Sequence, residues 1–410
     1  MTIAYLAPEI PARSATFVYQ EIHELQKRGI SVCSFSLHTP HDPAPDQQAL
    51  RDRTHYLYAE GYLAVALKAI RNMFRSGIRV GQGLRALVSD LRQLSGLRTR
   101  AKLCFQFLAA VNLADALVKN RISHVHVHFA HVPTQVAMYA SVMTGVPFTV
   151  TSHANDIFER GLLLALKAER STRFFTISDY NLKFLKDQGV PESRLGIVRC
   201  GVALSYKRKT PNLQSDKKSL VIGSLGRLVE KKGMDVLLQA LASLITEYPE
   251  WDITLRIAGD GPLKSVLQQQ AKALAVDDKV HFDGALQHSQ VGEWLDQLDM
   301  FVLACKIDAN GDMDGIPVVL MEAMSQSVPV VTTNLSGIPE LVIPDVTGYL
   351  AEQGDAQSLQ DAVGRLLANR ERLEEITARA LQHVADEFSL ESNVDRLVVE
   401  FNRSQVQGVK

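Results

Sequence analysis

The sequence contains few cysteines and none of the patterns in which cysteines usually act together. Four of its 410 residues are cysteine, and no two of them form a C-x-x-C pair. This disfavours a disulfide framework and a zinc ribbon, and it favours a reducing cytoplasm as the location. One short apolar run precedes Glu9 at the N-terminus, so we expect no secretory signal peptide.

Long apolar runs and a dinucleotide fingerprint are also missing. The longest apolar stretch, 103–118, is interrupted by Gln106, Asn112 and Asp115, so we predict no membrane-spanning helix there. The pattern G-x-G-x-x-G does not occur, which disfavours a two-domain dehydrogenase.

The chain has no excess of charge of one sign. It holds 44 basic and 45 acidic residues, a net charge of −1, which argues against a dedicated nucleic-acid binder. The two halves differ, however: residues 1–205 have 24 basic and 15 acidic side chains, and residues 206–410 have 20 and 30. This asymmetry favours a polyanionic partner for the first half.

Short apolar runs alternate with helix-period segments along the chain. Most runs are continuously apolar, as in buried parallel strands, so we predict an α/β fold of two Rossmann-like domains facing across a cleft. The predicted strands cover 3–7, 31–37, 125–129, 148–152, 219–225, 253–259, 279–282, 300–303 and 328–332. The predicted organisation is a first domain over 1–205, a linker over 206–218, a second domain over 219–385, and a helix in 386–410 that packs on the first domain.

The first motif in the second half, SLVIGSLGRLVEKKG, combines a strand, a glycine loop and the start of a helix. Gly226 permits a tight turn, and Arg227 and Lys232 place two cations just before a helix that we expect to begin near Met234. Fixed positive charge beside unpaired backbone N–H groups favours a bound diphosphate. The alternative is that both cations are solvated loop charges.

The second motif, RIAGDGPL, joins a predicted strand to a predicted helix. Gly259, Gly261, Pro262 and Leu263 would hold a nucleoside at the edge of the sheet, or they would only form a tight turn.

The third motif, DMDGIPVVLMEAM, carries two carboxylates eight residues apart. A helix beginning at Pro317, after a turn containing Gly315 and Ile316, would place Asp314 and Glu322 on one face. There they would accept hydrogen bonds from the hydroxyl pairs of a sugar and a ribose. The alternative is an amphipathic helix with surface acids.

These motifs resemble the retaining, nucleotide-sugar-dependent glycosyltransferases of family 4, which have the GT-B fold, and most of all the exopolysaccharide and colanic-acid-type branch. The resemblance runs through GRLVEKKG, AGDGP, DGIPVVLMEAM and SGIPE. It implies that Asp314 contacts donor-sugar hydroxyls and Glu322 holds the ribose. It also implies that Arg227 and Lys232 neutralise the departing diphosphate, with Glu340 near the donor. Asp314 replaces the usual glutamate, which leaves the donor identity open.

In the first half, His153 directly follows the predicted strand 148–152. That position is the C-terminal end of a parallel strand, where such sheets bind ligands. The sequence HAND resembles the family's His-Gly-x-Asp stretch, which implies that His153 approaches the transferring sugar. Asp156 is a predicted acceptor contact.

Two further features of the first half concern the acceptor and metals. PARSATF resembles a Ser-Glu-Thr-Phe segment of exopolysaccharide glycosyltransferases, which places Ser14 and Thr16 at the mouth of the cleft, although N-capping would also explain them. His124, His126 and His128 share one strand face. Since no nearby acid or cysteine completes the set, we predict no metal, and we predict packing or acceptor binding for His128.

Residues 68–102 contain nine basic residues and one acid. Lys68, Arg71, Arg75 and Arg79 recur every three or four residues and form one predicted helical stripe beside apolar side chains. Basic amphipathic helices bind anionic membranes, so we expect docking on a membrane surface; a solvated helix face is the alternative. Docking would suit an acceptor carried on polyprenyl diphosphate.

We therefore predict a retaining hexosyltransferase that moves a sugar from a nucleoside diphosphate, UDP more than GDP, to a saccharide acceptor in bacterial exopolysaccharide or cell-envelope polysaccharide synthesis. No cofactor or divalent metal is expected, because the paired cations would stabilise the leaving group. The alternatives are a GT-B nucleotide-sugar epimerase or hydrolase, and a non-catalytic nucleotide-sugar-binding protein.

Overall fold

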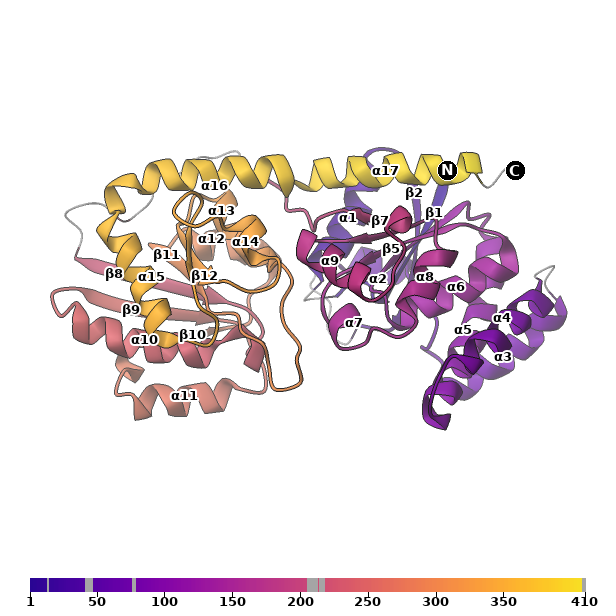
Figure 1. Ribbon diagram of the computed structural model, residues 1–410, viewed down its shortest axis with the longest axis horizontal. Coiled ribbons are helices and arrows are strands. Elements are labelled where there is room, and N and C mark those ends of the chain that lie inside the picture. Colours follow the sequence, from indigo (N-terminus) through magenta and orange to yellow (C-terminus); the bar gives the residue numbers. More distant parts are fainter. Residues whose placement is uncertain (13–14, 41–46, 76–78, 205–212, 214–217, 408–410) are drawn as a thin grey trace. The chain divides into compact units, whose positions relative to one another are not determined.

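The computed structural model describes residues 1–12, 15–40, 47–75, 79–204, 213 and 218–407. The chain divides into two compact units (Figure 1). The N-terminal unit comprises Met1–Ile177, Leu182–Val198 and Val394–Lys410, and the C-terminal unit comprises Ser178–Asn181 and Arg199–Asn393. Of the predicted linker, only Leu213 and Lys218 lie within the described residues.

The N-terminal unit is built on a seven-stranded sheet in the order β3-β2-β1-β4-β5-β6-β7, and its neighbouring strands are parallel. The strands are β1 (Thr2–Glu9), β2 (Ser31–His38), β3 (His55–Tyr56), β4 (His124–His128), β5 (Phe148–Ser152), β6 (Arg173–Thr176) and β7 (Leu195–Ile197). The helices are α1 (Thr16–Lys27), α2 (Gln48–Arg53), α3 (Tyr62–Arg75), α4 (Val80–Arg92), α5 (Leu97–Lys119), α6 (Val132–Thr144), α7 (Asn155–Phe158) and α8 (Leu164–Arg170). Helix α9 (Asp179–Asp187) begins with residues assigned to the C-terminal unit and continues with residues of the N-terminal unit.

Helix α5 is long and apolar enough to cross a membrane by length and composition. A single such helix is weak evidence for a membrane span, because the core helix of a folded domain passes the same test. Helix α5 packs against α3 and α6, and Phe107 and Leu113 are buried in the core of the unit. Its apolar composition is therefore explained by packing inside the N-terminal unit.

The C-terminal unit is built on a six-stranded sheet in the order β10-β9-β8-β11-β12-β13, again with parallel neighbours. The strands are β8 (Ser219–Leu225), β9 (Asp252–Ala258), β10 (Val280–Gly284), β11 (Met300–Leu303), β12 (Val330–Thr333) and β13 (Tyr349–Ala351). The helices are α10 (Met234–Glu247), α11 (Lys264–Ala273), α12 (His288–Leu295), α13 (Val318–Ser325), α14 (Ile338–Leu341), α15 (Ala356–Ala368) and α16 (Leu373–Glu387). Helices α10 and α15 pack together, as do α13 and α16.

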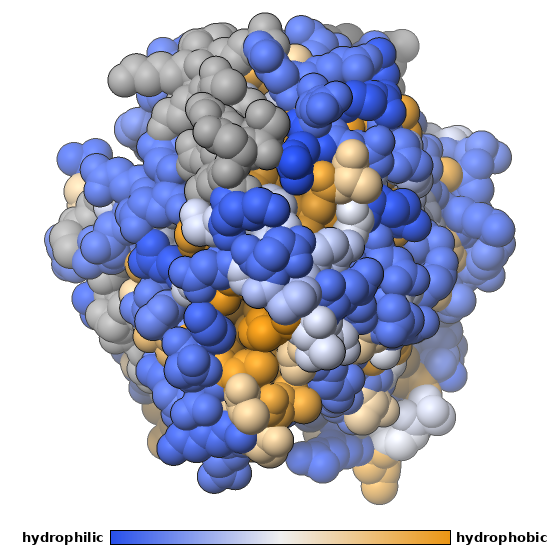
Figure 2. All heavy atoms as spheres, turned by 90° about the vertical axis from the view of Figure 1, so that its left-hand side faces the viewer, coloured by the Kyte–Doolittle hydropathy of each residue, from blue (hydrophilic) through white to orange (hydrophobic). Residues whose placement is uncertain are grey.

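The α/β class with parallel sheets is confirmed, and all nine predicted strands are present. Strands β3, β6, β7 and β13 were not predicted; three of them have only two or three residues, too few to show a periodic pattern. The surface of the C-terminal unit that faces the viewer in Figure 2 is mostly hydrophilic, with a small group of apolar side chains. Such a surface is ordinary for a folded domain.

The last helix, α17 (Leu390–Gln407), begins in one unit and ends in the other. Within the N-terminal unit, the ring of Phe401 packs 5.0 Å from that of His124 and 5.3 Å from that of His126. The hydroxyl of Ser404 lies 3.1 Å from that of Thr172. These contacts hold Phe401 and Ser404 of α17 against the N-terminal unit.

Candidate active site

The loop after β8 forms the first part of a candidate donor site in the C-terminal unit. A Cβ at Gly226 would lie 3.3 Å from Lys232 Cε, so the lysine side chain lies against this loop. Gly233 precedes α10 with φ +62°, and a Cβ there would come within 1.7 Å of the Ala304 carbonyl oxygen. Only glycine fits this close approach, which lets α10 begin at Met234, as predicted.

Four charged side chains meet beside this loop. Lys232 Nζ lies 2.8 Å from Asp314 Oδ2, and Lys231 Nζ lies 2.8 Å from Asp312 Oδ2 and 3.7 Å from Asp314 Oδ1. The thiol of Cys305 donates to Asp314 Oδ2 at 3.4 Å. The structure thus brings together the predicted residues Lys232 and Asp314, and it adds Lys231 and Asp312.

Burial and charge oppose each other in this cluster. Burial, the largest single effect, would lower the pKa of Lys232, but Asp314, Cys305 and Asp312 together raise it. Burial alone would raise the pKa of Asp314, but Lys232 and Lys231 lower it. Both groups therefore stay charged at neutral pH. Burial, followed by the Asp314 charge, raises the pKa of the Cys305 thiol, which stays protonated.

The predicted common face for Asp314 and Glu322 is wrong. Helix α13 begins at Val318, with Pro317 as its N-cap, so Asp314 lies in the loop before the helix. The two carboxylates have different partners: Asp314 pairs with lysines, whereas Glu322 Oε1 lies 3.5 Å from His288 Nδ1. The spacing of eight residues therefore does not place the two groups on one helical face.

Glu322 is largely buried in the C-terminal unit. Only 16% of its side chain is exposed, and burial raises its pKa to about 7. A carboxyl group with this pKa is present in both protonation states at neutral pH. His288, the first residue of α12, was not singled out from the sequence, because no local pattern connects it to a carboxylate 34 positions later.

The Gly-Asp-Gly-Pro segment joins two loops of the unit. A Cβ at Gly259 would lie 1.9 Å from the Gly226 carbonyl oxygen, and one at Gly261 would lie 2.5 Å from that of Leu228. The Leu228 N–H donates to the backbone carbonyl of Asp260, and the Leu263 N–H donates to the backbone carbonyl of Leu228. These glycines therefore let the loop after β9 pack directly on the loop after β8. Pro262 lies within the same segment, just before α11.

Arg227 and Glu340 differ in the ion pairs and hydrogen bonds that their side chains form with the described residues. Arg227 is exposed, and the described residues offer its guanidinium no ion pair. Glu340 accepts hydrogen bonds from the backbone N–H groups of Asp179 and Tyr180, each at 3.0 Å, and from Arg199 Nη1 at 2.7 Å. Glu340 thus fixes the start of α9, and its predicted place near the donor phosphate stays a prediction.

Gly315 and Ile316 complete the turn before α13. Ile316 is buried, and it lies 2.9 Å from where a Cβ on Gly337 would be. The turn thus packs on the Ser-Gly-Ile-Pro-Glu segment, which brings the third motif and the residues around Glu340 together.

A second cluster lies in the N-terminal unit, at the C-terminal ends of the neighbouring strands β4 and β5. His128 Nδ1 lies 3.2 Å from His153 Nε2, and His128 Nε2 lies 3.1 Å from Glu21 Oε1. The His153 ring lies 4.6 Å from both Phe17 and Phe129. Burial, aided by His128, lowers the pKa of His153, so this imidazole is neutral at pH 7.

The statement that no nearby acid completes the histidine set is wrong. Glu21, on α1, brings its carboxylate to His126 and His128, and one ligand atom from each of the three residues lies within 4.8 Å of the others. The sequence did not show this contact because Glu21 is more than 100 positions away from the strand. Such a set could hold a metal ion; His124 instead bonds to Thr149 Oγ1 at 2.9 Å.

Asp156 is fully buried and holds the loop after β4. It accepts the N–H of Ala130 at 2.6 Å and that of His153 at 3.0 Å. Lys167, also fully buried, donates to the Ala130 carbonyl at 2.5 Å, and burial lowers its pKa to about 7. These contacts are structural, and acceptor binding by Asp156 stays a prediction.

Of the two predicted acceptor residues near α1, Ser14 lies outside the described residues. Thr16 is the first residue of α1, and the N-cap is Ala15, whose side chain cannot cap the helix. The N-capping alternative is therefore wrong for Thr16.

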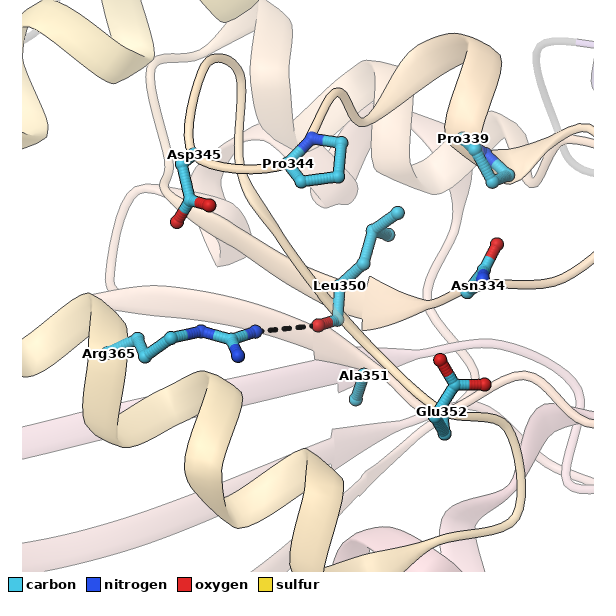
Figure 3. A pocket seen from close by; sticks show the side chains of 8 residues that line it. All are labelled: Asn334, Pro339, Pro344, Asp345, Leu350, Ala351, Glu352 and Arg365. Carbon is cyan, nitrogen blue, oxygen red and sulfur yellow. Dashed lines mark hydrogen bonds between the residues drawn. The ribbon is translucent and has the colours of Figure 1, made fainter.

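A pocket of about 340 Å³ lies in the C-terminal unit (Figure 3). It is partly formed by Asn334, which follows β12, and Glu352, which follows β13. Arg365 donates to the Leu350 carbonyl at 2.8 Å across its floor. None of the predicted site residues lines this pocket, although Pro339 on its wall is the neighbour of Glu340.

Comparison with known proteins shows which families the chain resembles. Residues 14–206 match the family described as Glycosyltransferase Family 4, and residues 206–383 match Glycosyl transferases group 1. A protein of Salmonella typhimurium described as a colanic acid biosynthesis glycosyltransferase, WcaL, is 28% identical over 95% of this chain and 96% of its own length. The amylovoran biosynthesis glycosyltransferase AmsK of Erwinia amylovora is also 28% identical, with the same coverage.

Solved structures show the same fold. Anabaena HepE in complex with UDP and glucose has a TM-score of 0.72 and 15% identity over 98% of this chain and all of its own. Sucrose-phosphate synthase from Thermosynechococcus elongatus has a TM-score of 0.73 and 16% identity over 98% of each chain. With two parallel α/β units and sequence matches along almost its whole length, the chain belongs to the family 4 glycosyltransferases and has the GT-B fold.

Proposed function

We propose that the chain transfers a hexosyl group, with retention, from a nucleoside-diphosphate sugar to a saccharide acceptor in bacterial exopolysaccharide or cell-envelope polysaccharide synthesis. The observation that carries this proposal is the Lys232–Asp314 ion pair, beside the Gly226 loop and the start of α10. A cation held there beside the N-terminus of a helix is suited to a diphosphate leaving group. The matches to colanic acid and amylovoran enzymes support the polysaccharide class.

The residues divide the work as follows. Lys232 and exposed Arg227 would neutralise charge that develops on the departing diphosphate. Asp314 would accept hydrogen bonds from donor-sugar hydroxyls while Lys231 and Lys232 hold it in place. Glu322 would accept hydrogen bonds from the ribose, and His153 would meet the transferring sugar. We favour a front-face displacement in which the departing phosphate accepts the acceptor's proton.

Asp312 is a further candidate for a sugar contact. Its Oδ2 pairs with Lys231, but its buried Oδ1 has no hydrogen-bond partner among the described residues. A buried acceptor oxygen without a partner is costly, and a donor hydroxyl would satisfy it.

We further propose that UDP is the nucleotide, because HepE binds UDP and glucose. A thermal-shift screen against UDP, GDP, ADP and their common sugar conjugates tests this. The native donor should raise the unfolding midpoint by mass action, whereas the other nucleotides should leave it nearly unchanged. Equal shifts with all three would contradict UDP selectivity.

Turnover with and without an acceptor separates transfer from the alternatives. With the nucleotide sugar alone, a transferase should release almost no free sugar and form no epimer. With a lipid-linked saccharide, NMR of the product should show the anomeric configuration of the donor. Epimer formation, rapid hydrolysis or an inverted product would contradict the proposal.

We propose that the acceptor lies on the inner face of the cell membrane and that α3 docks there. One side of α3 is buried, through Val65 and Ala69. Four apolar side chains on its other side, one per helical turn, are exposed: Leu63, Leu67, Ile70 and Phe74. Exposed Lys68 and Arg71 supply positive charge on the same helix. An apolar stripe with neighbouring cations is typical of helices that lie in an anionic membrane surface.

The predicted single basic stripe needs a correction. Helix α3 ends at Arg75, and Arg79 is the N-cap of α4, so the four basic residues do not lie along one helix. The proposal that α3 docks on a membrane therefore rests more on the exposed apolar residues of α3 than on the spacing of the cations.

A further inference from the structure

Glu322, the residue proposed to hold the ribose, lies beside an imidazole from another helix. His288 Nδ1 on α12 lies 3.5 Å from Glu322 Oε1 on α13, and the two side chains are 33% and 16% exposed. No other side chain among the described residues forms an ion pair with Glu322. His288 is therefore the neighbour that can fix the direction of this largely buried carboxyl group.

The contact is favourable in either protonation state of the carboxyl group. An ionised carboxylate accepts a hydrogen bond from a ring nitrogen that carries a proton, and a protonated carboxyl group donates to a ring nitrogen that does not. At 3.5 Å, a small rotation of either side chain forms this bond. The interaction is thus available whether Glu322 is ionised or protonated.

A second contact, one helical turn further along, connects the same two helices. A Cβ on Gly292 would lie 3.0 Å from the Gln326 amide, so the glycine leaves room for this side chain. With its amide nitrogen assigned to face acceptors, Gln326 donates to the Gly292 carbonyl oxygen and to Asp296 Oδ1, each at 3.0 Å. Gly292 and Gln326 lie four residues after His288 and Glu322, so both contacts follow the same helix faces. The position of His288 beside Glu322 is therefore set by two helices.

The first turn of α12 also has a fixed backbone. Gln290 Oε1 accepts a hydrogen bond at 2.9 Å from the backbone N–H of Gln287, the N-cap residue. His288 is the first residue after this cap, so its backbone is held at the start of the helix. A side chain on a fixed backbone can orient a neighbouring group at a small cost in conformational entropy.

We propose that His288 is a positioning residue for Glu322: by holding Oε1, it turns Oε2 toward the ribose hydroxyl groups of the donor nucleotide. This inference rests on the proposed role of Glu322 at the ribose. Without His288, the terminal torsion of the carboxyl group is broad, so nucleotide binding would have to fix it at an entropic cost. His288 and Glu322 together determine the preference for a ribonucleotide over a 2′-deoxyribonucleotide.

The test compares the dissociation constants of UDP and 2′-deoxy-UDP, measured by isothermal titration calorimetry on the full chain. The two ligands share the base and the diphosphate and differ by one ribose hydroxyl. The wild-type protein should bind UDP roughly 5- to 10-fold more tightly, which is the value of one hydrogen bond. His288→Ala should reduce this ratio to about 2-fold or less, through weaker binding of UDP. His288→Asn, whose amide nitrogen can replace Nδ1, should restore most of the ratio.

Two further variants serve as references. Glu322→Ala should abolish the ratio, and His281→Ala, at an exposed histidine on β10 of the same unit, should keep the wild-type ratio. A folded His288→Ala protein that keeps the wild-type ratio, or that loses affinity for both nucleotides equally, would overturn the proposal. A wild-type protein without the preference, or a Glu322→Ala protein that keeps it, would instead contradict the proposed ribose contact of Glu322.

Discussion

Two lysines and two aspartates meet in the C-terminal unit, and each lysine touches a carboxylate at 2.8 Å. At the scale of single residues, this cluster shows how a buried group stays ionised when groups of opposite charge lie beside it. The pKa of Asp314 is lowered although burial alone would raise it, because Lys232 and Lys231 stand beside it. A buried ion pair is sensitive to the loss of one partner, since the other charge then stays buried without compensation.

Lys232→Ala should reduce kcat by about 10²- to 10³-fold, because a cation at the leaving group stabilises charge that develops only in the transition state. Initial rates with nucleotide sugar and acceptor measure this effect. Lys306→Ala is the control, because Lys306 forms a comparable ion pair with Asp235 at 2.6 Å and has no proposed contact with the donor. Near-normal turnover of a folded Lys232→Ala protein would contradict the leaving-group role.

The raised pKa of Glu322 should make stability depend on pH. In the folded protein this pKa is about 7, against an ordinary value of 4.5. The folded state therefore binds the proton of Glu322 more tightly than the unfolded state does. The resulting contribution to the free energy of unfolding is complete below pH 4.5 and is lost as the pH rises through 7. The shift corresponds to about 3 kcal/mol. Glu322→Gln should gain about that much stability relative to wild type between pH 4.5 and 8.

Urea unfolding of both proteins at several pH values measures the difference. If the stability difference between Glu322→Gln and wild type stays constant across this range, the buried, protonated carboxyl is ruled out.

Helix α3 illustrates the scale of the element, because its two sides are apolar for different reasons. The inner side packs on α5, where Asn72 donates to Asn112 at 3.0 Å, and the outer side leaves Leu63 and Phe74 exposed by 74% and 87%. Sequence periodicity alone could not distinguish the buried side from the exposed side. Which side of α3 is buried depends on the packing of α5 against it.

Replacing Leu63 and Phe74 by glutamate should weaken binding to vesicles that contain anionic lipid, since it removes apolar area and adds negative charge. Co-sedimentation with vesicles measures binding, and the fold should stay intact because both side chains point outward. Val266→Glu, at a half-exposed apolar position on α11, is the control and should bind like wild type. Unchanged binding of the double variant would restore the solvated-face alternative.

The start of α10 depends on Gly233. An alanine there would meet both a positive φ and the Ala304 carbonyl oxygen, so Gly233→Ala should destabilise the protein by roughly 2–4 kcal/mol. Gly354→Ala is the matched control: its φ of +73° is similar, but nothing lies within 4 Å of its Cβ. The control should lose only about 1 kcal/mol. Equal losses in urea unfolding would show that the close approach to Ala304 has no cost.

At the scale of the whole molecule, two parallel α/β units each keep their own cluster of polar groups. The C-terminal unit carries lysines where a diphosphate would bind, and the N-terminal unit carries histidines at the ends of β4 and β5. The protein should therefore keep nearly full turnover after dialysis against EDTA, without added Mg²⁺ or Mn²⁺. Assays with and without each ion measure this, and a strict requirement for either would contradict leaving-group stabilisation by Lys232 and Arg227.

The sequence by itself determined the α/β class, most strands, the family, and the start of α10 near Met234, because these depend on short-range periodicity and backbone freedom. It could also place Lys232 before α10, since loop and helix are contiguous. The tertiary structure alone decided which groups meet: Lys231 with Asp312, Glu322 with His288, and Glu21 with His128. Such partners come from distant elements, and only the packing of strands and helices sets the distance between them.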